Sequence, residues 1–256
     1  MKKDLKSGKL IMMLYRFTLL SFLIPTVYLI VRIILSENTA LDAGEYRARA
    51  EYVLMLIQCM LGLAVIHLPT IIERRFKFEI PNVLQILYIV FLYCAIFLGE
   101  VRNFYYTVPH WDDILHCISS VMTGLFGFLA VTVLNQDKKV RINLSPFFVA
   151  LFAFCFSVSI GAIWEIYEFS ADEFMGLNMQ KFMLRDGTQL MGHSALSDTM
   201  IDIIIDCCGA FIATIIGYLS IKNKTGWVHE YFTGEGKSKN VENIKEENIK
   251  NEETNK

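Results

Sequence analysis

The sequence predicts an all-α integral membrane protein with about six transmembrane helices. One reason is composition, because 54% of the 256 residues are apolar, whereas soluble domains usually contain about 45–50%. The other is arrangement, because the apolar residues form runs close to the roughly 20 residues needed to cross a bilayer core. The linkers between the runs are short. We therefore expect one membrane domain over residues 1–222, with no separate soluble domain.

Six apolar runs account for the predicted spans. The first run exceeds the 7–15 residues of a signal-peptide core and has no clear cleavage site after it, so we expect a retained helix. The next two contain few polar residues, mainly Gln58, His67 and Gln85. The last three have acids at one end. The predicted spans are Leu14–Leu35, Tyr52–Ile72, Pro81–Leu98, Ile114–Leu134, Pro146–Trp164 and Met200–Ile221.

The distribution of Lys and Arg predicts the orientation of the chain. Basic residues concentrate before the first run, between the second and third, between the fourth and fifth, and after the sixth. Because basic residues favour cytoplasmic loops, we expect both termini in the cytoplasm. Trp111 and Trp164 then lie at the outer interface. Residues 223–256 form a cytoplasmic tail whose Lys/Glu/Asn-rich part, from about residue 234, is predicted to be disordered.

Two further features of composition exclude other classes of protein. The net charge of −2 gives no basic surface for nucleic acid. All six cysteines fall inside predicted spans and form no CxxC pair, so the sequence contains no disulfide framework.

Acidic residues repeat at helical spacing at the outer ends of the fifth and sixth predicted spans. Residues three, four or seven positions apart share one helix face. Asp206 lies about 12 Å deeper than Asp198 along a helix, where an ionised group costs about 2.5–3.5 kcal/mol on insertion scales. The two stripes are Glu165, Glu168 and Asp172, and Asp198, Asp202 and Asp206.

A histidine near the start of the fourth span adds a metal-binding pattern. Asp112 and Asp113 both approach the face of His116, and Asp113-x-x-His116 has the spacing of the carboxylate–histidine turn in helix-bundle metal sites. The part of the chain that carries this predicted site spans about residues 95–220. Carboxylates plus one imidazole suit Mg²⁺, Mn²⁺, Fe²⁺ or Zn²⁺. We expect a divalent cation to be held by Asp113, His116, Glu165 and Asp202.

The remaining charged residues at this end are expected to act as catalytic residues, as phosphate-binding residues or as further members of the polar site. Glu168 is the expected general base, and Asp112 is a second candidate catalytic residue. Three bases can hold a phosphate headgroup: Arg102, Lys181 and Arg185. Four acids complete the predicted polar site: Glu100, Asp172, Asp198 and Asp206. For any single acid, helix capping or solvation in the headgroup zone is the competing interpretation.

Four ordered strings resemble the YjdF-like family of bacterial membrane-spanning proteins, whose biochemical function is unassigned. They are W-D-D-I-L-H at 111–116, W-E-I-Y-E-F-S-A-D at 164–172, G-L-N-M-Q at 176–180 and D-T-M-I-D-I-I-I-D-C-C-G-A at 198–210. The resemblance implies a multi-helix inner-membrane fold. A fainter similarity is to the VanZ-like proteins, which usually have Asn at the position of Asp206 and Gln at that of Glu168.

These patterns leave three functions open for a multi-pass protein of the bacterial cytoplasmic membrane. The first is a metal-dependent hydrolase or transferase acting on an envelope lipid or lipid-linked substrate. The second is a proton- or cation-coupled transporter, which needs a polar path across the whole bilayer. The third is a non-enzymatic assembly or resistance factor. Membrane lipid is the expected partner in the first case.

Overall fold

The computed structural model describes residues 2–35, 49–76, 79–136, 144–184 and 187–225. These residues are mainly helical and form no β-strand beyond one isolated bridge between Met183 and Gln189. The tail predicted from residue 223 lies almost entirely outside this described part. In chain order the elements are α1 (Lys2–Leu35), α2 (Arg49–Val65), α3 (Leu68–Phe76), α4 (Asn82–Leu92), the π-helix η1 (Tyr93–Val101), α5 (Phe104–Thr107), α6 (Trp111–Gln136), α7 (Pro146–Met175) and α8 (His193–Lys222).

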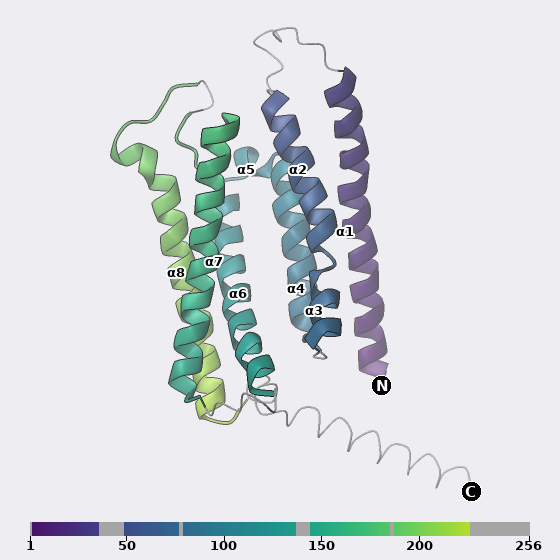
Figure 1. Ribbon diagram of the computed structural model, residues 1–256, viewed down its shortest axis with the longest axis vertical. Coiled ribbons are helices and arrows are strands. Elements are labelled where there is room, and N and C mark those ends of the chain that lie inside the picture. The colour runs from purple at the N-terminus through teal and green to yellow at the C-terminus, as the bar shows by residue number, and fades with distance from the viewer. Residues whose placement is uncertain (1, 36–48, 77–78, 137–143, 185–186, 226–256) are drawn as a thin grey trace, which may run out of the picture.

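Six helical segments are long and apolar enough to cross a membrane: α1, α2 with α3, α4 with η1, α6, α7 and α8. The predicted all-α, six-span fold is therefore confirmed. The start of α1 and the end of α8 lie at one end of the bundle (Figure 1), while the starts of α6 and α8 and the end of α7 lie at the other. Which end faces the cytoplasm stays a prediction.

Helices α6, α7 and α8 pack closely because small residues stand at their crossings. A Cβ on Gly127 of α6 would lie 2.7 Å from the Ala153 Cα of α7. A Cβ on Gly209 of α8 would overlap the Ser120 hydroxyl of α6. Glycines and other small residues at such contacts let the backbones of membrane helices approach each other. The approach brings the polar stripes of the three helices together.

The first three spans form a second group around an apolar core. Phe22 of α1 and Cys59 of α2 are fully buried there, beside Tyr88 of α4. Met122 of α6 belongs to the same core. At the end that carries the acids, Leu54 of α2 packs with Ala171 and with Leu177, which follows α7. The two groups of helices therefore share apolar contacts.

Helix α7 continues past the predicted span end at Trp164 as far as Met175. It begins where the Ser145 side chain accepts a hydrogen bond from the Phe148 N–H at 3.3 Å, with Pro146 in the first turn. It ends at Gly176, whose left-handed φ of 66° lets its N–H bond to the Asp172 carbonyl at 3.0 Å. The acids after Trp164 are consequently held on a helix and not in a loop.

Candidate metal centre

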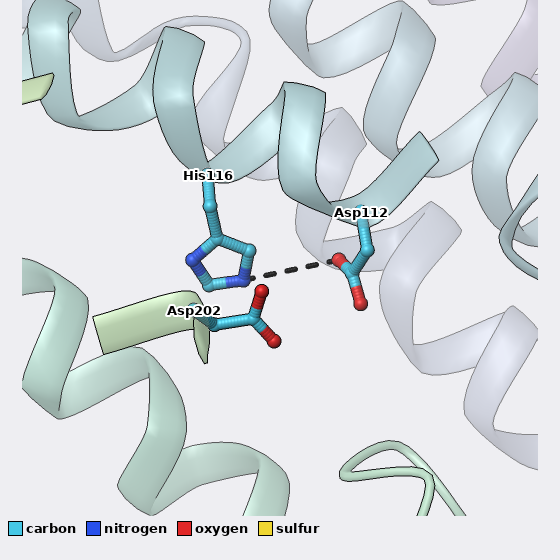
Figure 2. Close-up of side chains that lie close together, drawn as sticks. All are labelled: Asp112, His116 and Asp202. Carbon is cyan, nitrogen blue, oxygen red and sulfur yellow. Dashed lines mark ion pairs between the residues drawn. The ribbon is translucent and has the colours of Figure 1, made fainter. Parts of the chain in front are cut away.

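Three buried side chains from two helices form a group that can hold a cation. Asp112 and His116 lie one turn apart on α6, and Asp202 lies on α8. One ligand atom of each lies within 4.8 Å of the others, and the residues are 8%, 5% and 1% exposed. Figure 2 shows the His116 ring and the two carboxylates turned toward one another.

The structure brings Asp112, and not the expected Asp113, to His116. Residues four apart on an α-helix differ by about 40° in direction, whereas residues three apart differ by about 60° on the other side. Asp113 instead makes a 2.7 Å ion pair with the exposed His110. The carboxylate in the group with His116 is thus four residues away along the helix and not three as expected, and it is Asp112 that belongs to the group that can hold a cation.

The two nitrogens of His116 have different environments. Nδ1 lies 3.2 Å from the Asp206 carboxylate. Nε2 lies 3.8 Å from Asp112 Oδ1 and 3.7 Å from Glu165 Oε1, too far for hydrogen bonds. Nδ1 can donate to Asp206, and Nε2 faces the carboxylates of Asp112 and Glu165. A carboxylate on the other ring nitrogen orients metal-binding histidines in this way.

Several buried carboxylate oxygens around His116 have no hydrogen-bond partner among the described residues. An unsatisfied buried polar group costs about 1–3 kcal/mol, and more when it is charged, so such groups are uncommon and need a cause. Here a cation, water or protons must balance them. The atoms are Glu165 Oε1 and Oε2, Glu168 Oε2, Asp202 Oδ2 and Asp206 Oδ1.

Glu165 and Glu168 share one face of α7 and have different partners. Glu168 Oε1 accepts a 2.9 Å hydrogen bond from the Trp164 indole N–H, which leaves Oε2 available. Glu165 is 4% exposed, and its Oε1 lies 3.7 Å from His116 Nε2. The expected stripe on α7 therefore does reach the centre, with Glu165 beside the imidazole.

Lys181 connects the centre to the segment that follows α7. Its ammonium lies 2.7 Å from Asp112 Oδ2 and 2.9 Å from Asp198 Oδ1. Burial lowers the pKa of Lys181, but the carboxylates of Asp112 and Asp198 outweigh burial, and the pKa is raised above its ordinary value. The ammonium is therefore charged at physiological pH. Asp112 joins the two groups, with one oxygen on Lys181 and the other facing His116.

The other predicted polar residues have separate environments. Asp172 accepts the backbone N–H groups of Met179 and Gln180 at 2.6 and 2.9 Å, so it anchors the segment that presents Lys181. Glu100 on η1 accepts a 3.2 Å hydrogen bond from Gln58 of α2. Arg102 is exposed just after η1. Arg185 lies outside the described residues.

A pocket of about 320 Å³ adjoins the centre at the end of the bundle. Its lining combines the linker before α6, the first turn of α6 and Lys181; Asp112 belongs to both the pocket and the centre. The linker contributes Tyr105, which the sequence analysis missed because it falls in a short segment between spans. Burial raises the pKa of Tyr105, and the nearby carboxylates of Asp112 and Glu100 raise it further, so it remains a phenol.

The polar part of the bundle ends below the centre. The Ser157 hydroxyl donates to the Ser120 carbonyl at 2.8 Å and lies 2.8 Å from the Thr123 hydroxyl. Below these residues is a buried apolar cluster of α6, α7 and α8, which separates these polar groups from the other end of the three helices. The cluster consists of Phe128, Val131, Val149, Ala153 and Ile221.

Comparisons with known proteins agree with this architecture. Residues 20–223 match the model of a family described as "Predicted membrane protein (DUF2238)". An uncharacterized protein of Thermotoga maritima is 30% identical over 159 residues, which cover 62% of this chain and 72% of that protein. No solved structure matches. The YjdF-like resemblance is consistent with this family, and the VanZ-like one stays a prediction. The chain is a multi-pass membrane protein that belongs to the DUF2238 family.

Proposed function

We propose that the protein is a membrane-embedded, metal-dependent hydrolase or transferase that acts on the headgroup of an envelope lipid or lipid-linked substrate. The cation is held by Asp112, His116 and Asp202. The observation that carries the proposal is the arrangement of His116, with Nδ1 held by Asp206 and Nε2 facing buried carboxylates. If His116 served only as a positive charge to balance the carboxylates, its Nε2–H would be expected to donate a hydrogen bond to one of them. The observed distances are too long for such a bond.

The ligand atoms fit a small divalent cation after a modest contraction. A tetrahedral site with bonds of about 2.1 Å places its ligands about 3.4 Å apart, whereas His116 Nε2 and Asp112 Oδ1 are 3.8 Å apart. For this pair the gap is a few tenths of an ångström, and for the group, whose ligand atoms lie within 4.8 Å of one another, it is at most about 1.4 Å, which side-chain rotation would have to close. One imidazole with carboxylate oxygens suits Zn²⁺, Fe²⁺ or Mn²⁺, and Mg²⁺ with added water.

The surrounding groups supply the remaining parts of a hydrolytic site. A bound cation lowers the pKa of a coordinated water toward neutrality. Glu168 has one oxygen held by Trp164 and the other without a described partner, and we assign it the role of the base that would accept a proton from such a water. Glu165 either completes the metal ligands or shares this role. The adjoining pocket of about 320 Å³ is near the lower limit of small-molecule sites, a size suited to a headgroup.

Transport is the weaker alternative because the buried apolar cluster from Phe128 to Ile221 interrupts the polar residues. A coupled transporter needs ionisable or hydrated groups that extend further across the bilayer. An assembly or resistance role without catalysis predicts no dependence of activity on a cation.

Metal content tests the proposal directly. We expect the detergent-purified protein to contain about one divalent cation per chain by elemental analysis. His116→Ala and Asp202→Asn should each remove it, and the double variant should be no worse than either single one, because ligands of one ion act as a unit. The control is Asp113→Asn, which should retain the metal since Asp113 pairs with His110.

Catalysis is tested with bilayers of defined phospholipids by measuring headgroup release with and without a chelator. Chelation should abolish release and the bound cation should restore it. Wild-type protein that contains no cation, or variants that keep the full metal content, would rule out this centre.

A further inference from the structure

The pocket beside the metal centre contains hydrogen-bond donors that the protein leaves available. Lys181 lines the pocket, and its ammonium has three N–H donors, of which two are directed to Asp112 and Asp198. The indole N–H of Trp111, also in the lining, is buried with no hydrogen-bond partner among the described residues. The Trp111 N–H is closed to solvent in this arrangement, so an acceptor from outside the chain reaches it after a small movement of the ring, whereas the Lys181 side chain is 31% exposed.

The acids of the lining are already paired, so the pocket is not an amine site. Asp112 bonds to Lys181 at 2.7 Å, and Asp113 bonds to His110 at the same distance. The charged Lys181 would in addition repel an ammonium group. Lys181 stands in the described lining beside two carboxylates, so the lining is not basic as a whole, and its unpaired donors favour a ligand that is rich in oxygen acceptors.

The donors are held in place by the surrounding structure. The Trp111 ring packs edge-on against Phe104 at a centroid distance of 5.0 Å. Lys181 has a left-handed φ of 46°, a conformation uncommon for a residue other than glycine. The two backbone N–H groups before it are bonded to Asp172. Such preorganisation reduces the ordering cost of binding.

From this arrangement we propose that the pocket binds the phosphate group of the substrate through Lys181 and Trp111. The Tyr105 phenol, which also lines the pocket, is a third donor. Asp112 connects this subsite to the metal centre, because its second oxygen faces His116. A phosphate bound to Lys181 would thus lie beside the proposed cation. The inference deepens the proposed function but does not require it, since the donors belong to the chain itself.

Equilibrium binding to the full-length protein in detergent tests this subsite, with two probes that separate the possible sources of phosphate. One probe is inorganic phosphate and the other is a short-chain phosphatidic acid. Binding of both indicates that the phosphate group alone is recognised, and binding of the lipid alone indicates a requirement for the acyl glycerol. Either result supports the subsite if Lys181 is required.

Two variants remove the donors one at a time. Loss of a charge-assisted hydrogen bond should weaken phosphate binding about 10- to 100-fold in Lys181→Met. Trp111→Phe should weaken it several-fold while keeping an aromatic ring, and it breaks no hydrogen bond within the described protein. The control is Lys222→Met, at the other end of α8, whose ammonium lies over the Tyr218 ring; it should bind like the wild type.

The measurement is made with and without the divalent cation, so the two proposals can fail separately. Lys181-dependent phosphate binding in protein that holds no metal would retain this subsite and reject the metal centre. Failure of both probes to bind, displacement of phosphate by choline, or unchanged affinity in both donor variants would overturn the subsite.

Discussion

At the residue scale, the most informative side chain is that of Asp206, which contacts His116 Nδ1. Asp206 is 2% exposed, and it directs one oxygen to His116 Nδ1 while the other has no described partner. Its depth in the bundle makes a purely structural acid expensive. In the proposed metal centre Asp206 is therefore a positioning residue, which would act on a cation only through the imidazole.

We expect Asp206→Asn to weaken metal affinity about 10- to 100-fold without abolishing binding, as loss of an outer-shell carboxylate typically does. An amide can still accept the Nδ1 proton but polarises the ring less. Titration of metal-free protein with Mn²⁺ or Zn²⁺ measures the effect. The control is Asp172→Asn, because Asp172 bonds to backbone N–H groups and makes no described contact with His116. Equal affinities in Asp206→Asn and wild type would remove this role.

At the element scale, the crossing of α7 and α8 decides whether Asp206 reaches His116. Gly161 on α7 lies against the Asp206 side chain, and a Cβ at that position would overlap the carboxylate. The glycine is therefore needed for close approach, with no special backbone angle involved. The packing that holds the helices together and the geometry of the site depend on the same small residue.

Gly161→Ala should displace the Asp206 carboxylate and lower metal affinity by a similar factor, about 10-fold or more. The cost to folding should be smaller than for a buried backbone clash, because a side chain can rotate away. Gly124→Ala is the matched control, since its Cβ would meet the Ala213 Cβ at 3.3 Å and the Thr214 Cγ2 at 4.0 Å and no carboxylate within 4 Å. Metal titration and thermal unfolding of both variants separate the effects; equal loss of metal in both would contradict the assignment.

The local sequence specified more of the fold than of the site. Runs of apolar residues located the six spans because bilayer thickness sets their length. Helical spacing located the stripes on α7 and α8. It favoured Asp113 as the ligand beside His116, whereas the structure brings Asp112 there and pairs Asp113 with His110, a contact that helical spacing alone does not reveal. The pocket was not foreseen, since it is lined by a linker and by Lys181, which are distant in sequence.

At the scale of the whole molecule, an even number of spans places the start of α1 and the end of α8 on the same side. The metal centre and pocket lie toward the opposite end. The distribution of basic residues predicts that this opposite end faces away from the cytoplasm. Substrates would then come from the outer leaflet.

Cysteine labelling in intact cells checks this orientation. Phe174 is 86% exposed near the end of α7, so Phe174→Cys should react with a membrane-impermeant maleimide. Lys224→Cys, just after α8, should react only after the cells are permeabilised. The unaltered protein, with its six native cysteines, provides the background. The reverse pattern would place the site on the cytoplasmic side.

The apolar cluster from Phe128 to Ile221 also determines which solution the site can equilibrate with. Because it lies below Ser157 and Thr123 in the described part of α6, α7 and α8, we expect protons and ions to exchange with the carboxylates from the Lys181 end. We also expect the transmembrane voltage to fall mainly across this apolar layer. Acidifying the compartment at the Lys181 end should change occupancy by protons or metal, whereas acidifying the other compartment should not.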